Sequence, residues 1–296
     1  MEQHKTNSLY FENFTHQMNP KGVFIISHGM AEHMGRYKWL ISKLNDDGYH
    51  VISRDHKGHG KNIANGDTQG FFSENNGWLK VRDDLKETIN HAENKFPNLS
   101  CFLLGHSMGS WIALSTLHNK SSIKALILTG SSKLSRLSII LNIIIIKIDI
   151  IFNGKLNKST IMDTLSMRRF NSQFKPNKTP NDWISSDEDS VNEYTNDPLC
   201  GFTVTSGLWL DLCRGLLMIF NKDYYSNLNY HIPILIISGK EDAASNNSLL
   251  SIKLYKFLSK IFSNVSHKIV NSRHEVFTDL TKKSSYNLLS KFIQQI

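Results

Sequence analysis

Cysteine is scarce in this 296-residue chain, which argues against a disulfide-rich protein and against a metal site built from cysteines. Cys101, Cys200 and Cys213 form an odd and widely spaced set, which provides neither a disulfide framework nor the spacing of a metal site. The first ten residues are polar and lack the apolar core of a signal peptide. We therefore expect a cytoplasmic protein, and the 40% of hydrophobic residues is enough for a sizeable core.

The sequence also lacks the patterns by which proteins bind nucleotides and nucleic acids. The formal net charge is +8 and the isoelectric point is about 9.2, but the lysines are scattered, with no dense basic block. No phosphate loop is present, and Gly-x-Gly-x-x-Gly does not follow the first apolar run. We expect no nucleic-acid partner, although the basic balance leaves weak attraction to anionic lipid open.

Two parts of the chain alternate between short apolar runs and amphipathic segments. Near-continuous apolar runs fit parallel strands that are buried on both faces, and the segments between them repeat apolar residues at helical spacing. This alternation predicts an α/β protein with a doubly wound, mostly parallel sheet that binds ligands at the carboxyl ends of its strands. The expected strands are 8–14, 23–27, 50–54, 102–104, 123–128, 233–238 and 264–270, and the expected helices are 35–47, 78–96, 108–118, 248–262 and 277–295.

A strongly apolar segment at 134–152 stands outside this alternation. An uninterrupted run of ~20 apolar residues would suggest a membrane-spanning helix. Here Asn142, Lys147 and Asp149 interrupt the run, which favours a cap helix that covers a pocket. The apolar surface of such a cap also allows peripheral contact with a membrane.

The loss of alternation divides the chain into a core and an insertion. We predict that residues 1–130 and 231–296 form the core and that residues 131–230 form a mainly helical cap. Within this cap, 171–196 is polar and loop-like, and 203–220 is a second apolar, helix-like segment. The cap is expected to lie over the carboxyl edge of the sheet, where the ligand would bind.

The pentapeptide Gly105-His106-Ser107-Met108-Gly109 follows an apolar run and precedes a helix-like segment. This order places a serine on a sharp strand-to-helix turn, the nucleophile elbow of serine hydrolases, where residues two positions away must lack a Cβ. At average glycine usage the pattern would occur by chance in roughly one chain in ten of this length. Residues elsewhere in the chain must therefore support it.

A serine hydroxyl needs a base to take its proton and a third group to orient that base. Asp242 and His274 each follow a predicted strand, so both should reach Ser107 from the same edge of the sheet. The chain order Ser107, Asp242, His274 is the order expected when a serine elbow forms a catalytic triad on such a sheet. These three residues are the predicted catalytic residues.

Alternatives exist for two members of this triad. Asp242 could instead cap the helix that follows it, and the neighbouring Glu241 could be the acid. His274 is one of thirteen histidines, and five others lie in suggestive places, but only His274 occupies the last strand–helix turn. The five others are His28, His33, His56, His59 and His106.

The developing oxyanion needs hydrogen-bond donors. One should be the amide of Met108, because it lies at a helix N-terminus where N–H groups lack partners. The second should be the amide of Met30, in the loop that begins with His28 and Gly29 after the first long strand. Glu32 in the same loop is expected to hold the loop in place, together with Arg36, by an ion pair or hydrogen bonds. We predict no metal, because His56 and His59 have no carboxylate or cysteine set at ligand spacing, and no cofactor.

At these residues the chain resembles the α/β-hydrolase family, and more narrowly its monoacylglycerol lipase or lysophospholipase-like branch. The cap carries further similarities to bacterial lysophospholipases. The residues that carry the resemblance are His28–His33 with Arg36-Tyr37, Asp55–Gly60, Gly105–Gly109, Asp242 and Arg273–Glu275 in the core, and Phe170-Asn171, Thr179, Asp182-Trp183 and Asp197–Phe202 in the cap.

This resemblance implies an α/β-hydrolase fold with a helical cap inserted after the sixth strand. It implies a serine esterase of lipid metabolism that hydrolyses a single-chain acylglycerol or lysophospholipid without a cofactor. Ala243 stands where the family often has proline, and Lys61 where a small residue is common, but neither departure removes a catalytic group. An acyltransferase, an aminopeptidase and a non-catalytic ligand-binding protein remain alternatives on the same scaffold, and nothing here indicates the oligomeric state.

Overall fold

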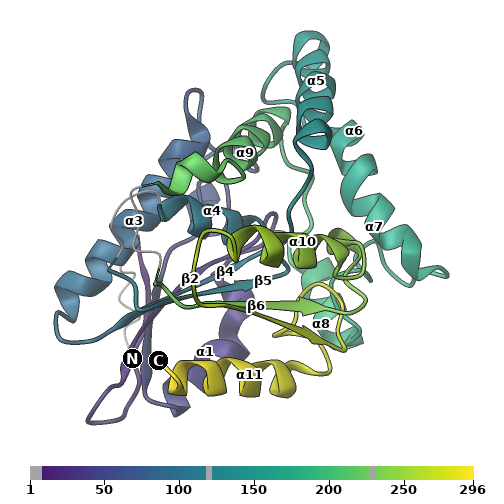
Figure 1. The fold of residues 1–296 in the computed structure, drawn as a ribbon. Coiled ribbons are helices and arrows are strands. Elements are labelled where there is room, and N and C mark those ends of the chain that lie inside the picture. The colour runs from purple at the N-terminus through teal and green to yellow at the C-terminus, as the bar shows by residue number, and fades with distance from the viewer. Residues whose placement is uncertain (1–8, 118–121, 227–230) are drawn as a thin grey trace.

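The computed structural model describes residues 9–117, 122–226 and 231–296. Its centre is a seven-stranded sheet with helices on both faces (Figure 1). The strand order is β1-β3-β2-β4-β5-β6-β7, in which β1 pairs antiparallel with β3 and all other neighbours are parallel. The strands are β1 (Phe11–Asn13), β2 (Gly22–Ser27), β3 (Tyr49–Ser53), β4 (Cys101–His106), β5 (Ala125–Thr129), β6 (Ile234–Gly239) and β7 (Val265–Val270).

The structure contains the five helices predicted for the core, with boundaries shifted by a few residues, together with further helices that lie mostly in the insertion. In chain order, the described helices are α1 (Lys38–Asp46), α2 (Lys61–Ala64), α3 (Gly77–Lys95), α4 (Met108–Thr116), α5 (Arg136–Asn153), α6 (Thr160–Asp163), α7 (Arg169–Asn171), α8 (Glu188–Asn196), α9 (Ser206–Ile219), α10 (Leu249–Leu258) and α11 (Lys282–Gln294). Short 3-10 or π turns are η1 (Met34–Tyr37), η2 (Thr164–Arg168), η3 (Ser172–Phe174), η4 (Lys222–Tyr225) and η5 (Ala243–Ser245). The predicted helix end at His118 and the predicted cap end at Tyr230 lie outside the described residues.

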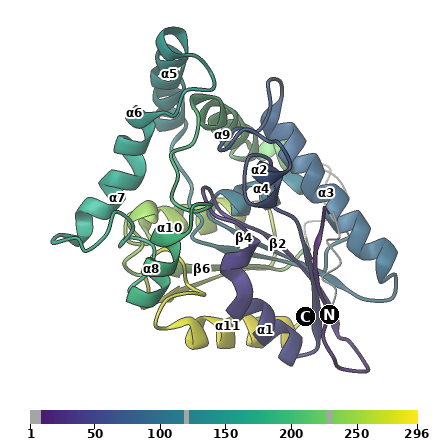
Figure 2. The same ribbon diagram turned by 180° about the vertical axis from the view of Figure 1, so that it is seen from behind.

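The sheet is buried on both faces, as its apolar runs predict. Successive side chains of a strand point to opposite faces, so Val23 and Ile25 of β2 enter one core cluster while Phe24 and Ile26 enter the other. Helices α1 and α11 cover one face, and α3, α4 and α10 cover the other (Figures 1 and 2). This arrangement leaves the carboxyl ends of the strands as the edge where side chains from different strands converge.

The insertion follows β5, the fifth strand described, and the predicted position after a sixth strand is wrong. One short antiparallel strand, β1, precedes the parallel part of the sheet. The chain then turns at Asn19-Pro20 and enters β2, so that four parallel strands and β1 precede the insertion. No strand of the sheet lies between β5 and β6 in the part of the chain that the structure describes. The sheet continues at β6, which pairs directly with β5.

Helix α8 lies within 171–196, which the sequence pattern treats as a polar loop. Asp187 caps this helix by accepting hydrogen bonds from the amides of Asp189 and Ser190. Acidic residues in the first turn suit the positive end of the helix dipole, and Val191 and Tyr194 form its buried face. The prediction missed the helix because only two apolar residues mark it, three positions apart.

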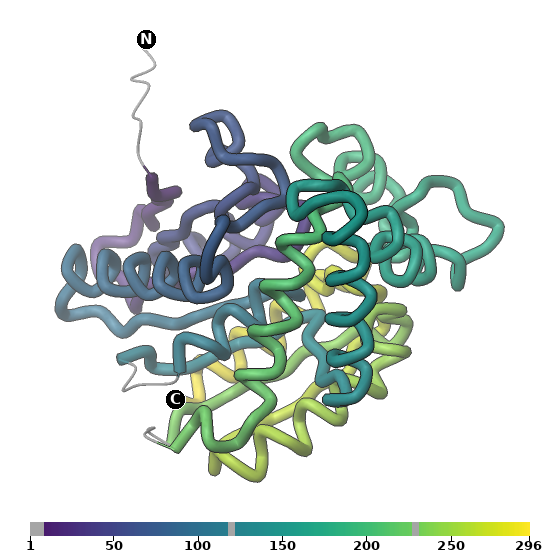
Figure 3. Tube along the Cα trace, turned by 90° about the horizontal axis from the view of Figure 1, so that it is seen from above, coloured from purple at the N-terminus to yellow at the C-terminus, as the bar shows by residue number. Residues whose placement is uncertain are grey.

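The two long helices of the insertion, α5 and α9, pack against each other, and α5 lies far from the sheet (Figure 1). Seen from above, the teal and green helices of the insertion lie side by side in front of the core (Figure 3). Helix α5 begins after Ser135, whose hydroxyl accepts a hydrogen bond from the Ser138 amide, and ends at Gly154. Among the residues described, no helix combines the length and the apolar character needed to cross a membrane.

Candidate active site

Ser107 lies in the turn between β4 and α4, in a backbone conformation that few residues other than glycine adopt. Its φ is 50° and its ψ is −120°, and its amide donates to the Thr129 carbonyl of the next strand at 2.9 Å. A Cβ added to Gly109 would lie 2.1 Å from the Ser27 carbonyl oxygen, and one added to Gly105 would lie 2.6 Å from Ser110 Cα. The elbow therefore closes only because both positions are glycine.

His274 and Asp242 meet at the same edge of the sheet. His274 follows β7, Asp242 follows β6, and His274 Nδ1 lies 2.9 Å from Asp242 Oδ1. The carboxylate can only accept, so Nδ1 carries the proton and Nε2 keeps its lone pair for a base. The same oxygen accepts from the Ala244 amide at 3.0 Å. Asp242 is thus both the cap of η5 and the partner of His274, whereas the alternative acid, Glu241, is exposed.

Ser107 follows β4 at the same edge of the sheet as this pair, but it is not bonded to the pair. The described part of the chain shows no hydrogen bond between Ser107 and His274. In enzymes without substrate such bonds are often long and tighten only when substrate binds. Gly130 keeps the space open on the far side of the imidazole, because a Cβ there would lie 2.9 Å from His274 Cε1.

The charges of the pair stabilise each other. Burial alone would raise the pKa of Asp242, but the charge of His274 and its hydrogen bond hold that pKa below the ordinary value. Burial alone would lower the pKa of His274, but the charge of Asp242 and its hydrogen bond raise it above the ordinary value. The arrangement therefore favours a histidine that accepts a proton readily next to a carboxylate that stays ionised.

His106, the residue before the serine, is buried between Thr129 and His274. Its Nδ1 lies 3.0 Å from Thr129 Oγ1, and its ring centroid is 4.9 Å from that of His274. Burial and the neighbouring His274 lower the pKa of His106 to about 3, so it is neutral at physiological pH. It borders a buried cavity of about 20 Å³ with Glu32 and Glu275, which has room for one water molecule.

The peptide between Gly29 and Met30 is held in one orientation by His28. The backbone amide of His56 donates to His28 Nε2 at 2.9 Å, so the proton of His28 is on Nδ1, which donates to the Gly29 carbonyl at 2.8 Å. In a trans peptide the N–H points opposite to the C=O, so the Met30 amide points away from His28. A Cβ at Gly29 would lie 3.3 Å from Ser107 Cβ, which shows how closely this loop approaches the serine.

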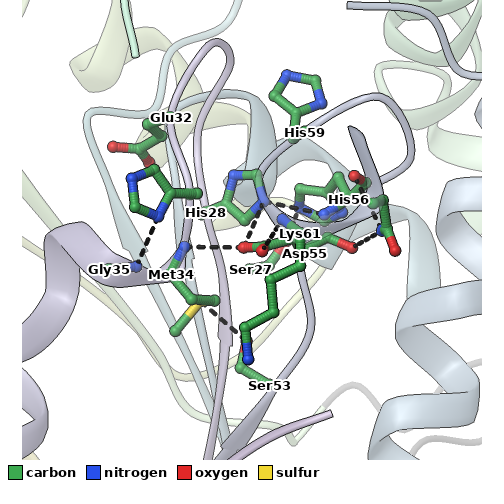
Figure 4. A network of polar contacts seen from close by, with 12 residues as sticks. Ser27, His28, Glu32, Met34, Gly35, Ser53, Asp55, His56, His59 and Lys61 are labelled. Carbon is green, nitrogen blue, oxygen red and sulfur yellow. Dashed lines mark hydrogen bonds and ion pairs between the residues drawn. The ribbon is translucent and has the colours of Figure 1, made fainter. Parts of the chain in front are cut away.

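A buried polar network ties this loop to the loop that follows β3 (Figure 4). Asp55 accepts from the amide of Met34 at 2.9 Å and from the amide of Lys61 at 2.8 Å. His56 Nε2 lies 3.1 Å from Ser27 Oγ. Burial lowers the pKa of His28 and His56. Burial thus favours the neutral form of both rings, whose hydrogen bonds hold the two loops together.

Glu32 holds the loop by hydrogen bonds, whereas Arg36 acts through a different partner. Glu32 Oε1 accepts from the Gly29 amide and from the Tyr37 hydroxyl, the latter at 2.7 Å. Burial and the nearby Glu275 raise the pKa of Glu32 to about 7. Arg36 pairs with Glu275 at 2.8 Å. The prediction assigned both residues to this loop but did not include Glu275, although it directly follows His274 in the sequence.

The cap supplies contacts that the pattern of the core could not reveal. The Trp183 ring lies on His274, with centroids 4.8 Å apart. The carbonyl of Ala31, a residue with a φ of 54°, accepts from the Tyr194 hydroxyl and from the Gly201 amide, each at 2.9 Å. Trp183 and Gly201 lie in cap motifs that carry the family resemblance, whereas no sequence motif marked Tyr194.

Two groups bring potential metal ligands within 4.8 Å of one another, and both groups already have protein partners. In the first, Glu32, His106 and Glu275 surround the small buried cavity, and Glu275 is paired with Arg36. In the second, His33 Nε2 lies 2.9 Å from Asp197, and burial raises the pKa of the third member, Cys200. We assign neither group a chemical step.

The fold and the serine elbow beside a bonded histidine–aspartate pair are those of an α/β-hydrolase, and the protein is a serine hydrolase. Residues 18–281 match the family described as "Serine aminopeptidase, S33", and the chain belongs to that family, within its monoacylglycerol lipase-like branch.

Known proteins with similar sequences and structures agree with this assignment. The chain is 27% identical over 271 residues to a "Monoglyceride lipase homolog" of Monkeypox virus, covering 90% of this chain and 86% of that protein. It is 37% identical over 97 residues to the human "Monoglyceride lipase", covering 33% of this chain and 30% of that protein. A thermostable carboxyl esterase from Bacillus coagulans superposes with a TM-score of 0.85 at 26% identity, covering 97% and 93% of the two chains.

Proposed function

We propose that this protein hydrolyses carboxylic esters of single-chain lipids through an acyl-enzyme on Ser107. The observation that carries the proposal is the 2.9 Å bond between His274 and Asp242 at the edge of the sheet where Ser107 lies. A buried, oriented imidazole with a free Nε2 is the base that a serine hydroxyl needs. The loop containing Met30 approaches Ser107 closely, since a Cβ at Gly29 would lie 3.3 Å from Ser107 Cβ, and this supports the proposal that its amide donates to the oxyanion.

In the proposed mechanism, Ser107 Oγ attacks the ester carbonyl while His274 Nε2 takes its proton. Asp242 stabilises the imidazolium, and the amides of Met30 and Met108 donate to the oxyanion. The intermediate collapses when His274 returns the proton to the leaving alcohol, which leaves an acyl ester on Ser107. Water that is deprotonated by His274 then releases the fatty acid and restores the serine.

The substrate class is proposed to be a monoacylglycerol or a lysophospholipid. A cleft of about 560 Å³ opens between the loop that contains Ala31 and the cap. Its walls combine apolar side chains, such as Trp183 and Phe202, with polar ones, such as Arg168 and Lys175. Because Trp183 also contacts His274, a cleft of this mixed character suits an amphiphile with one acyl chain and a polar head group. The similarity to two proteins named as monoglyceride lipases supports the acylglycerol half of this proposal.

Hydrolysis of p-nitrophenyl butyrate by the wild type and by Ser107→Ala tests the chemistry. Removal of the nucleophile should lower kcat by at least about a thousandfold. Ser138→Ala, which removes an exposed serine of α5, is the matched control and should keep the wild-type rate. Equal rates for wild type and Ser107→Ala would contradict the proposal. A panel of monoacylglycerols and lysophospholipids with increasing chain length then tests the substrate class, and a preference for short, soluble esters would contradict it.

Three alternatives use the same scaffold. Acyl transfer would yield new esters or amides when alcohols or amines are added, and product analysis distinguishes it from hydrolysis. The description of the family favours testing an aminopeptidase with amino-acid p-nitroanilides. A non-catalytic ligand-binding protein would fail to label at Ser107 with a fluorophosphonate probe, whereas the proposed enzyme should label there and lose the label in Ser107→Ala.

We also propose that the enzyme works in the cytoplasm and contacts a membrane peripherally through the apolar surface of its cap. The described cysteines are all free and buried, which fits a reducing compartment. The substrates proposed are lipids that partition into membranes, so an enzyme that reaches the membrane surface would meet them at high local concentration.

A further inference from the structure

Helix α5 has two apolar faces, and the protein covers only one of them. Ile139 and Ile146 are buried in the core, on the side that packs against α9. A second stripe recurs at helical spacing on the opposite side and is open to solvent. We call this stripe the outer cap face, and its members are Leu137, Ile140, Leu141, Ile144, Ile148, Ile151 and Phe152.

The exposure continues beyond the helix into the next segment of the cap. Ten of the sixteen large hydrophobic residues that are exposed in the described structure lie between 137 and 165. The most exposed of these ten are Ile151 at 76% and Phe152 at 81%, at the end of α5 in the region farthest from the sheet in Figure 1. Contiguous apolar surface of this kind marks a binding surface for a protein or a membrane.

Charge within the cap is separated along the chain. Residues 133–178 contain nine basic and two acidic side chains, a formal net charge of +7, while the whole chain carries +8. Residues 182–197 contain six acidic and no basic side chains. The segment that bears the outer cap face is therefore basic, and the segment that follows it is acidic.

The acidic segment is partly neutralised by the core. Arg36 lies 3.8 Å from Glu193, Lys282 lies 3.4 Å from Asp187, and the His33 ring donates to Asp197. These contacts hold the acidic segment against the core and offset part of its charge. A further acidic residue, Glu188, pairs with Lys178 at the end of the basic segment.

The basic segment retains charges that nothing in the described structure balances. Arg136, Lys147, Arg169 and Lys175 are exposed, and the described residues offer them no ion pair. Arg136 lies one turn from Ile140, and Lys147 lies within one turn of Ile144 and Ile151, so two of these charges flank the apolar stripe itself. Two copies of the protein that met through this face would bring like charges together, which disfavours self-association.

We propose that the outer cap face docks on an anionic lipid bilayer, with the isoleucines among the acyl chains and the basic residues among the lipid headgroups. A helix that lies in the membrane interface combines these two features, and its binding depends on both apolar area and charge. This inference rests on the proposed membrane contact of the cap and adds its orientation and its lipid preference.

The test measures binding separately from catalysis by using Ser107→Ala protein. Co-sedimentation is measured with vesicles of phosphatidylcholine alone and with vesicles that contain phosphatidylglycerol as well, at about 0.1 M and about 1 M salt. Binding should be stronger to the anionic vesicles, and the higher salt should remove most of the difference. Replacing Arg136 and Lys147 by glutamine should weaken anionic binding by about thirtyfold, given the attraction of each basic residue near such a surface.

Matched variants separate charge from apolar contact. Ile151→Ser with Phe152→Ser should reduce binding to both kinds of vesicle. Lys268→Gln with Ile269→Ser removes an exposed lysine and an exposed isoleucine from β7 of the core and should change neither. Circular dichroism and p-nitrophenyl butyrate hydrolysis in the Ser107 background confirm that each variant is folded.

Each contrary result has a distinct meaning. Equal binding to both kinds of vesicle would overturn the lipid preference while leaving membrane contact intact. Absence of binding to any vesicle, with hydrolysis of the soluble ester retained, would overturn docking without affecting the proposed chemistry. A stable dimer that Ile151→Ser with Phe152→Ser dissociates would show that a second copy covers the face and would also overturn the proposal.

Discussion

The candidate active site and the outer cap face treat polar and apolar groups in opposite ways. At the active site, carboxyl groups such as those of Asp242 and Glu32 are buried, and each accepts hydrogen bonds from donors of the same chain. On the outer cap face, large apolar groups such as Ile151 and Phe152 are exposed, with no partner from the chain to cover them. The polar groups of the active site therefore find their partners within one molecule. The apolar side chains of the outer cap face can be covered only by something outside the molecule.

The largest expected effect breaks the active site. Asp242→Asn removes the charge that stabilises the protonated His274 and can present the wrong hydrogen-bonding group to Nδ1, so kcat for p-nitrophenyl butyrate should fall about 10⁴-fold. Glu241→Gln, at the exposed neighbouring position, should leave kcat unchanged. A larger loss in Glu241→Gln than in Asp242→Asn would show that the wrong acid has been assigned.

A second prediction compares the two faces of α5 directly. Ile146 is fully buried and Ile148 is half exposed. Ile146→Ala leaves a cavity and should lower the free energy of unfolding by about 2–5 kcal/mol, while Ile148→Ala should change it by less than about 0.5 kcal/mol. Urea unfolding of both variants gives the values, and similar losses in the two would mean that the outer cap face is covered in solution.

A third prediction concerns Glu32, whose role is to accept hydrogen bonds. Glu32→Ala leaves the Gly29 amide and the Tyr37 hydroxyl without an acceptor and should cost about 1–3 kcal/mol of stability, with a fall in kcat as the loop loses its position. Glu32→Gln keeps an acceptor oxygen and should preserve most of both. Thermal unfolding and steady-state kinetics measure the two effects, and equal damage from the two variants would indicate that the carboxylate charge matters instead.

The smallest effect is a shift of the pH profile. His274 must be neutral to act as a base, so kcat/KM should rise with pH as its imidazolium loses a proton. Because Asp242 raises the pKa of His274, the midpoint of this rise should lie above 6.5, the ordinary histidine value. In Asp242→Asn the midpoint should move to lower pH. A midpoint that stays in place in this variant would mean that another group controls the acidic limb.

The comparison also explains what the sequence could reveal. Strands buried on both faces appear as continuous apolar runs, and Ser107, Asp242 and His274 each follow such a run, so their convergence could be predicted without a structure. The apolar runs predicted the mostly parallel sheet and the family resemblance predicted the α/β-hydrolase fold, and the structure and its similar structures confirm both. The assignment of catalytic roles to these residues stays a prediction that the variants above test.

The cap was harder to predict because its contacts are not periodic. Helix α8 has only Val191 and Tyr194 to indicate a buried face, and its acidic N-terminus looks like a solvated loop. The contact of Trp183 with His274 joins residues 91 positions apart, with no local pattern to indicate it. The two-sided character of α5 was visible only as an excess of isoleucine, and the structure was needed to show which side lacks a partner.

The direct pairing of β5 with β6 has a consequence for how such a protein can diversify. Leu126 stands beside Ile234 in the sheet, although the whole cap lies between them in the chain. The register of the two strands therefore owes nothing to the length or composition of the inserted segment. Evolution can lengthen or shorten the insertion while the strands that position Ser107 and Asp242 stay paired, as long as the contacts that Trp183 and Tyr194 make with the core are kept or replaced.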